Sequence, residues 1–355
     1  MPVSISGTSG VTFPDSSLQA AAASPYVLKN RIINGAMVID QRNAGASVTS
    51  GFPVDRFQVY STQSSKWTAQ QSTTAPTGFT NSVIITSSSS YSPISSDYFS
   101  YTTRIEGFNV ADLDWGTANA KTITVSFWVR SSLTGTWTGA LHNNAFNRVY
   151  PFSYTISSAN TWEYKTVTVT GDTTGTWLTN NSVGIEIGFA FSVGSSGLGT
   201  AGAWTNTASI FGATGQTNLL GTNGATFYIT GVQLEIGSTA TPFERRLYNQ
   251  ELANCQRYFY LISQPPFRGV VSAATGAGRC GYNHPVTMRA APSLVASAAL
   301  PIYDGGVTST ATISSNYSTI SICEVDLTGA TGLTTFRPAI VYQSGSSNLQ
   351  VSAEL

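Results

Sequence analysis

Residues 122–130 read TITVSFWVR, and this segment decides the fold class. Its apolar side chains recur at every second position, which places them on one face of an extended strand. Those positions are Ile123, Val125, Phe127 and Val129. The opposite face would carry Ser126, Trp128 and Arg130. The pattern predicts a half-buried β-strand.

The segment VGIEIGFAFSV at residues 183–193 alternates in the same way. One face carries the large apolar side chains of Val183, Ile185, Ile187, Phe189 and Phe191. The other face carries Gly184, Glu186, Gly188 and Ala190. Because glycine and alanine are small, we expect the second face to leave room for an aromatic ring or a ligand.

A third strand is expected at residues 225–237, after the turn signal Asn223–Gly224. Its apolar positions are odd-numbered before Gly231 and even-numbered after it. A glycine at such a phase change predicts a β-bulge, which bends the strand.

The whole chain is predicted to be all-β. It has 355 residues, of which only 10% are charged, and it contains 17 Phe, 16 Tyr and 7 Trp. Short strands between Gly, Ser, Thr and Asn turns are typical of a β-sandwich or jelly roll. We predict an N-terminal arm (1–29), a jelly-roll sandwich (30–243), one connecting helix (244–262) and a small C-terminal β domain (263–355).

The connecting helix is predicted from a heptad stripe in ERRLYNQELANCQRYFYLI. The stripe consists of Tyr248, Leu252, Cys255, Phe259 and Ile262. Such a stripe can form a seam between copies of the chain, although two heptads are short for a coiled coil. Packing of the same stripe on the neighbouring sandwich remains an equal alternative.

The charge balance argues against two classes of partner. Seventeen Lys and Arg balance seventeen Asp and Glu, whereas phosphate backbones and anionic membranes are bound through clustered positive charge. The opening MPVSISGTSG lacks the features of a secretory signal, and no apolar run approaches the roughly 20 residues of a membrane helix. We therefore expect synthesis in a cytoplasm, with no nucleic-acid partner and no membrane insertion.

The supply of reactive groups is small. Cys255, Cys280 and Cys323 are widely spaced and are expected to be buried thiols. His142 and His284 have no Cys or catalytic Ser motif beside them. We therefore expect no catalytic residue, no metal site and no cofactor, and thus a protein that is not an enzyme.

Aromatic side chains are the remaining candidates for function, because sugars stack their apolar faces on Trp and Tyr rings. Trp137, Trp204 and Trp177 lie among Gly and Thr, as in turns, and Trp128 is on the polar face of its strand. These four are the candidate glycan-binding residues. The alternative is that they cap the sandwich edge or lie in a subunit interface. Trp115 and Trp162 are expected in the core.

Three long runs, at residues 104–137, 150–181 and 222–259, together with NRIINGAMVIDQRNAG near the start, resemble a family of phage tail-fibre and virion structural proteins of marine and cyanobacterial phages. The resemblance implies a location in the virion and a jelly roll akin to carbohydrate-binding modules. It also implies a homotrimer whose N-terminal arm attaches to other virion proteins while the C-terminal domain lies distal.

The resulting hypothesis is a tail-fibre or appendage subunit that presents a glycan-binding-like domain to the host surface. Two alternatives remain open. One is a purely architectural virion protein, such as a head decoration or tail adaptor. The other is a tailspike that depolymerises polysaccharide, for which no paired carboxylates are evident in the sequence.

Overall fold

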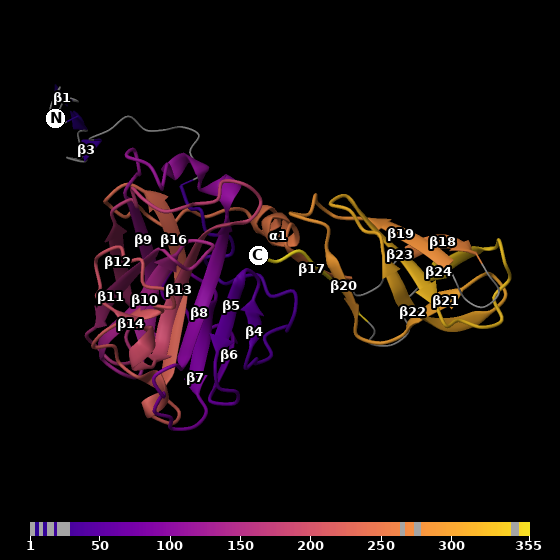
Figure 1. The fold of residues 1–355 in the computed structure, drawn as a ribbon, viewed down its shortest axis with the longest axis horizontal. Coiled ribbons are helices and arrows are strands. Elements are labelled where there is room, and N and C mark those ends of the chain that lie inside the picture. The colour runs from indigo at the N-terminus through magenta and orange to yellow at the C-terminus, as the bar shows by residue number, and fades with distance from the viewer. Residues whose placement is uncertain are drawn as a thin grey trace.

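The chain folds into a large β-sandwich and a smaller C-terminal β unit, with an α-helix between them (Figure 1). The structure is a computed structural model. It describes residues 29–262, 267–272, 278–341 and 348–355, and the backbone alone at 4–6, 10–12 and 18–19.

The sandwich consists of two antiparallel sheets. The six-stranded sheet has the spatial order β11 (Val149–Ile156), β10 (Gly135–His142), β13 (Val183–Val193), β8 (Tyr98–Glu106), β5 (Phe57–Ser61) and β4 (Gly51–Val54). The five-stranded sheet has the order β12 (Glu163–Val169), β9 (Ile123–Ser131), β16 (Thr226–Ile236), β7 (Ser82–Ser87) and β6 (Trp67–Ser72). The predicted all-β jelly-roll sandwich is confirmed.

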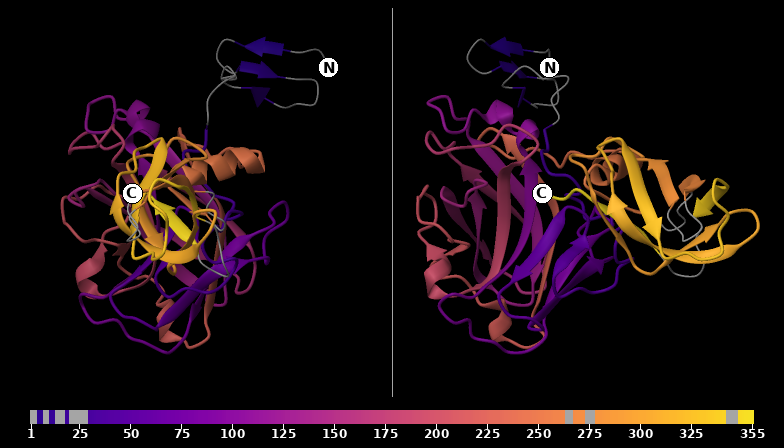
Figure 2. Two further views of the ribbon diagram at one scale, coloured as in Figure 1. Left: turned by 90° about the vertical axis from the view of Figure 1, so that its right-hand side faces the viewer. Right: turned by 45° about the vertical axis from the view of Figure 1, so that its right-hand side comes forward.

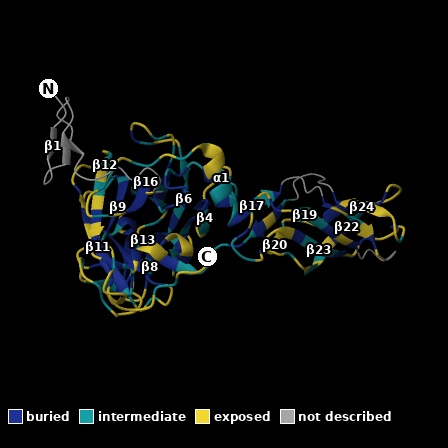
Figure 3. Cartoon of the chain, turned by 90° about the horizontal axis from the view of Figure 1, so that it is seen from above, coloured by how far each residue is buried: buried dark blue, intermediate teal, exposed yellow. Residues whose placement is uncertain are grey.

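The core of this unit lies between the two sheets, where the buried residues gather in Figure 3. The alternating side chains predicted to face it do so, since Ile123, Val125, Phe127 and Val129 are all fully buried. From β13, Ile185, Ile187, Phe189 and Phe191 meet them from the other sheet.

The predicted bulge in β16 is confirmed. The register of β16 against β9 shifts between Thr230 and Gln233, and Gly231 between them has a φ of +63°. A Cβ atom at Gly231 would lie 2.8 Å from Cζ of Phe79 and 3.1 Å from Cδ1 of Trp128. Both the backbone conformation and the space at this position therefore favour glycine.

We expect Gly231→Ala to lower the free energy of unfolding by about 1–3 kcal/mol, because alanine must adopt a left-handed conformation and displace an aromatic ring. Urea denaturation measures this effect. Gly281→Ala is the control, since the nearest atom to its added Cβ is 3.7 Å away and its φ is not in the left-handed range. Equal stability losses in the two variants would contradict the prediction.

The outer face of β13 is more crowded than predicted. Gly188 and Ala190 are buried, and a Cβ at Gly212 would lie 3.2 Å from Cβ of Ala190. Gly212 belongs to β15 (Gly212–Ala213), which pairs in parallel with β14 (Leu198–Gly199) and covers this part of the sheet. The expected space is therefore filled at Ala190, whereas Glu186 on the same face lines a cavity.

The helix α1 (Tyr248–Gln256) is shorter than the predicted helix at 244–262. Phe259 and Ile262 lie instead in a strand, β17 (Phe259–Ile262), which pairs with β25 (Leu349–Ser352). The sequence FYLI is apolar enough for either structure, and a partner strand some ninety residues later decides between them.

The predicted self-association seam is therefore wrong as a helical stripe. Cys255 and Phe259 are buried within the protomer, Ile262 is nearly so, and Leu252 is half-buried. Only Tyr248, at 63% exposure, presents a largely free side chain. The structure favours the alternative, in which the stripe packs inside its own chain.

The C-terminal unit contains a small sheet and a closed barrel. The sheet has the order β17, β25 and β20 (Ser293–Ala296). The barrel has the order β18 (Phe267–Val271), β19 (Gly278–Asn283), β23 (Ile322–Thr328), β22 (Thr308–Asn316), β21 (Leu300–Tyr303) and β24 (Pro338–Val341). The barrel stands in front of the sandwich in the left view of Figure 2. It confirms the predicted C-terminal β domain.

The predicted N-terminal arm falls largely outside the described residues. The described backbone contains β1 (Ser4–Ser6), β2 (Gly10–Thr12) and β3 (Leu18–Gln19), which pair as a three-stranded antiparallel sheet.

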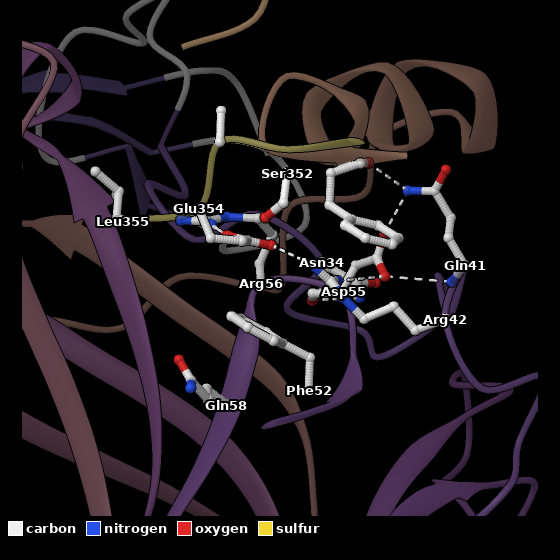
Figure 4. A network of polar contacts seen from close by, with 12 residues as sticks. Asn34, Gln41, Arg42, Phe52, Asp55, Arg56, Gln58, Ser352, Glu354 and Leu355 are labelled. Atoms are coloured by element: carbon white, nitrogen blue, oxygen red, sulfur yellow. Dashed lines mark hydrogen bonds and ion pairs between the residues drawn. The ribbon is translucent and has the colours of Figure 1, made fainter. Parts of the chain in front are cut away.

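The end of the chain returns to the sandwich and joins it through charged groups (Figure 4). Arg42 donates to Asp55 at 3.1 Å and to one oxygen of Glu354 at 2.8 Å, while Arg56 donates to the other oxygen of Glu354. Burial raises the pKa of Asp55 to about 6, although the Arg42 guanidinium opposes the shift. We call Arg42, Asp55, Arg56 and Glu354 the junction network.

A second set of contacts fixes the segment between α1 and β17. The buried carboxylate of Glu106 accepts from Arg257 at 2.6 and 3.0 Å and from the hydroxyl of Tyr258 at 2.7 Å. Arg56 also lies over the ring of Tyr258, 3.6 Å from its centroid. Both the outgoing and the returning chain are thus bound to the sandwich.

Candidate functional site

A groove of about 250 Å³ opens on the outer face of the six-stranded sheet. Its lining comes from β5, β8, β13 and two loops. The lining residues are Tyr60, Tyr98, Ser100, Arg104, Phe146, Glu186, Ser209 and Phe211. We call this feature the sheet groove.

Strand alternation places these side chains outward. In β5 the core residues Phe57 and Val59 alternate with Tyr60, which is only partly buried. In β8 the core residues Phe99 and Tyr101 alternate with Tyr98 and Ser100. Because successive side chains of a strand point to opposite faces, a well-packed core on one side fixes the aromatic rings on the other.

Aromatic rings form one wall of the sheet groove. Tyr98 and Phe211 stack with their ring centroids 4.1 Å apart and an interplanar angle of 15°. Phe146 and Phe211 both lie against the imidazole of His142, at 4.9 and 5.8 Å between centroids. Rings held in this way offer fixed apolar faces to a ligand, with little further entropy to lose on binding.

A charged pair lies beside the rings. Arg104 Nε donates to Glu186 Oε2 at 2.6 Å, and Arg104 Nη1 donates to the main-chain oxygen of Leu355 at 2.6 Å. The guanidinium also lies 5.4 Å from the ring centroid of Tyr60. The Tyr60 hydroxyl donates in turn to Gln58 at 2.5 Å. The polar groups of the site are therefore held by neighbours on β5, β13 and the end of the chain.

Burial governs the titration of the groups near the sheet groove. It lowers the pKa of His142, against the opposing influence of Glu186, and it raises the pKa of Tyr60. Burial also acts to lower the pKa of Arg104, but the Glu186 carboxylate more than offsets it, and the net shift is upward. At neutral pH the imidazole of His142 is therefore neutral, whereas the guanidinium of Arg104 is charged.

The four predicted glycan-binding tryptophans lie elsewhere. Trp137 was expected in a turn, but it lies in β10 with no exposed surface, packed on Phe191 and Phe227. A sugar cannot stack on a ring that is wholly inside the core, so this prediction is wrong. Trp128 is half-buried on the five-stranded sheet, beside Tyr164.

Trp177 and Trp204 belong to a cluster with Trp115. The three rings meet edge to face with centroid distances of 4.7, 5.3 and 5.4 Å. Every indole N–H in the cluster has an acceptor: Asp172 for Trp177, the Thr170 carbonyl for Trp204 and the Lys121 carbonyl for Trp115. This arrangement fits the alternative in which Trp177 and Trp204 cap the edge of the sandwich. Trp162, which was expected in the core, is only partly buried.

The sequence reading missed the aromatic residues of the sheet groove, namely Tyr60, Tyr98, Phe146 and Phe211. The sequence does contain a pattern that marks Tyr60 and Tyr98 as outward-facing. FQVYS at Phe57–Ser61 and YFSYTTRIE at Tyr98–Glu106 both alternate, and each leaves a tyrosine on the face opposite the core. Phe146 and Phe211 come from loops, where no periodicity marks the outward side.

The three thiols are buried, as predicted. Burial raises the pKa of Cys280 and Cys323 to about 11, and it raises that of Cys255 as well. Thiols in this state are weak nucleophiles at neutral pH. Across the described ranges there is no group of three or more His, Cys, Asp or Glu placed to hold a metal ion. None of the described helices has the length and apolar character that a membrane crossing requires.

Comparison with known proteins gives structural similarity without a sequence family. No family model and no curated protein matches the chain. Several solved structures resemble it. One is tailspike protein 4 of bacteriophage CBA120, with 12% identity and a TM-score of 0.33 over 59% of this chain and 21% of that one. Another is a putative sugar-binding protein from Bacteroides thetaiotaomicron, with 8% identity and a TM-score of 0.34 over 59% of this chain and 100% of that one. A further one is the family 11 carbohydrate-binding module from Clostridium thermocellum in complex with a mixed-linked tetrasaccharide, with 12% identity and a TM-score of 0.29 over 52% of this chain and 91% of that one. The chain thus spans about a fifth of the tailspike domain. Similarity at this level assigns no function.

Proposed function

We propose that this chain is a glycan-binding subunit of a phage tail fibre or virion appendage, and that it binds carbohydrate in the sheet groove without cleaving it. The observation that carries the proposal is the groove itself, in which the stacked pair Tyr98 and Phe211 adjoins the hydrogen-bonding pair Arg104 and Glu186. Apolar ring faces beside a few fixed polar groups are what sugar recognition requires.

The virion role is supported by the sequence resemblance to phage fibre proteins. In this proposal the chain assembles as a homotrimer, its N-terminal arm attaches to other virion proteins, and the C-terminal barrel lies distal. Three copies of the sheet groove would raise the effective affinity for a surface that carries many glycans, since linked sites reinforce weak contacts.

A binding role is preferred to hydrolysis because of the acids in the groove. Hydrolysis of a glycosidic bond usually requires two carboxyl groups that face each other across the sugar. Among the described residues that line the sheet groove, Glu186 is the only acid, and it forms an ion pair with Arg104.

Binding of the isolated protein to a glycan array tests the proposal. Two variants, each with one tyrosine replaced, are compared with the wild type in the same assay. Tyr98→Ala removes one of the two stacked rings, and we expect it to weaken glycan binding about tenfold, equivalent to about 1.4 kcal/mol. Tyr164→Ala is the matched control, because Tyr164 is an exposed tyrosine on the five-stranded sheet. It should leave binding unchanged.

Three results would contradict the proposal. Equal losses in the two tyrosine variants would remove the sheet groove from glycan recognition. A wild-type protein that binds no glycan and no host surface would favour a purely architectural virion protein. Release of products from host polysaccharide would instead indicate a depolymerase.

A further inference from the structure

Only one of the two carboxylate oxygens of Glu186 in the sheet groove is paired with Arg104. Glu186 Oε2 accepts from Arg104, whereas Glu186 Oε1 lies 3.8 Å from Nδ1 of the neutral His142 ring, beyond hydrogen-bond distance. The carboxylate side chain is 96% buried, so bulk water reaches it poorly. Glu186 therefore retains an acceptor directed at its immediate surroundings.

His142 supplies a second acceptor at the same place. Its Nε2 lies 2.7 Å from the carbonyl oxygen of Ile210, and because a carbonyl only accepts, Nε2 carries the proton of the neutral ring. Nδ1 is then a lone-pair acceptor, and it is a buried atom without a hydrogen-bond partner in the described part of the chain. The imidazole is 1% exposed. An unpaired acceptor at such a site is costly unless something donates to it.

These two acceptors face each other across 3.8 Å beside the groove. Of the two, Glu186 lines the groove, so a ligand group that donates a hydrogen bond is favoured beside it and a group that only accepts is repelled. The buried Nδ1 of His142 adds to the acceptor character behind Glu186. On the other side of Glu186, Arg104 uses two of the five N–H donors of a guanidinium in its bonds to Glu186 and Leu355. A ligand that binds beside Arg104 and Glu186 therefore meets hydrogen-bond donors and acceptors close together.

The charges of the site are already balanced. Arg104 and Glu186 are the only charged residues in the described lining, and they form an ion pair. A ligand carboxylate would gain little from a guanidinium that is already neutralised, and it would lie within a few ångströms of Glu186, where like charges repel strongly because the surroundings are poorly solvated.

We infer that the sheet groove selects a neutral sugar with adjacent free hydroxyl groups, one accepting from Arg104 and one donating toward Glu186, and that it discriminates against uronic and other acidic sugars. The inference rests on the proposed function and specifies its ligand class. Specificity of this kind arises because the wrong ligand leaves buried polar groups unpaired or brings like charges together.

The test compares two probes of equal length: a neutral hexose tetrasaccharide and the matching tetrasaccharide in which each hydroxymethyl group is oxidised to a carboxylate. Isothermal titration with the full-length protein is expected to show at least tenfold tighter binding of the neutral probe. Glu186→Gln keeps the shape of the side chain but leaves Arg104 unneutralised. We expect it to weaken neutral binding and strengthen acidic binding, so that the tenfold preference is lost or reversed.

Glu163→Gln is the matched control, because Glu163 pairs with Lys165 on the five-stranded sheet, away from the groove. It should retain the wild-type preference. A wild-type preference for the acidic probe, or an unchanged preference in Glu186→Gln, would overturn the inference while leaving the proposed function intact. Failure of the wild type to bind any glycan would overturn both. Should Glu186→Gln not fold, the wild-type ratio of the two affinities decides alone.

Discussion

Replacing Trp137 with alanine is expected to lower the free energy of unfolding by about 3–5 kcal/mol, the cost of deleting a large buried aromatic side chain. The ring is fully buried, with its centroid 4.7 Å from that of Phe227 and 6.4 Å from that of Phe191. Its removal leaves a cavity between the two sheets that the rigid strands cannot close. Urea denaturation followed by tryptophan fluorescence and circular dichroism measures the effect.

The comparison variant is Trp128→Ala, on the outside of β9. Trp128 is half-buried and contacts Tyr164, so its loss should cost clearly less than the loss of Trp137. A Trp137→Ala protein of wild-type stability that has lost glycan binding would restore Trp137 as a binding residue and refute its place in the core.

Removing the guanidinium of Arg56 is the second large effect. Arg56 donates to Glu354 and to the carbonyl oxygen of Arg104, and its side chain is almost fully buried. Arg56→Leu leaves Glu354 with Arg42 as its remaining partner in the junction network. Because breaking a buried ion pair leaves a charge poorly compensated, we expect a loss of about 3 kcal/mol in the free energy of unfolding.

Arg279→Leu is the control for this prediction. Arg279 forms ion pairs with Asp326 and Glu324, but its side chain is 55% exposed. Exposed pairs contribute about 0–1 kcal/mol, so this variant should be close to wild type. Thermal unfolding of both variants by differential scanning calorimetry gives the comparison. Similar stabilities of the two variants would show that the junction network does not hold the two units together.

The sandwich could be predicted from the sequence because its signals are local. The alternation at residues 122–130 and the phase slip at Gly231 each specify a structure within one segment, and both are confirmed. The helix could be predicted only in part. Its C-terminal end depends on β25, a strand that lies far along the chain, and no local pattern reveals that pairing.

The sheet groove could not be predicted, for a different reason. Tyr60, Tyr98 and Phe211 come from three distant segments, and only the folded sheet brings them together. Trp137 was misplaced because its neighbours in TGTWTG are Gly and Thr, a composition typical of turns. In the structure Trp137 lies in β10, and its indole packs against Phe191 and Phe227 in the core.

The return of the chain end to the sandwich has a mechanical consequence. A domain attached through one linker can swivel about it, whereas the barrel here is attached through an outgoing strand, β17, and a returning strand, β25, that are hydrogen-bonded to each other. Both attachments are anchored on the sandwich, the first at Glu106 and the second at Glu354. A pull on the C-terminal unit is therefore shared by two anchors on the sandwich instead of one. Because Arg104 also donates to the main chain of Leu355, the second anchor and the polar wall of the groove have one side chain in common.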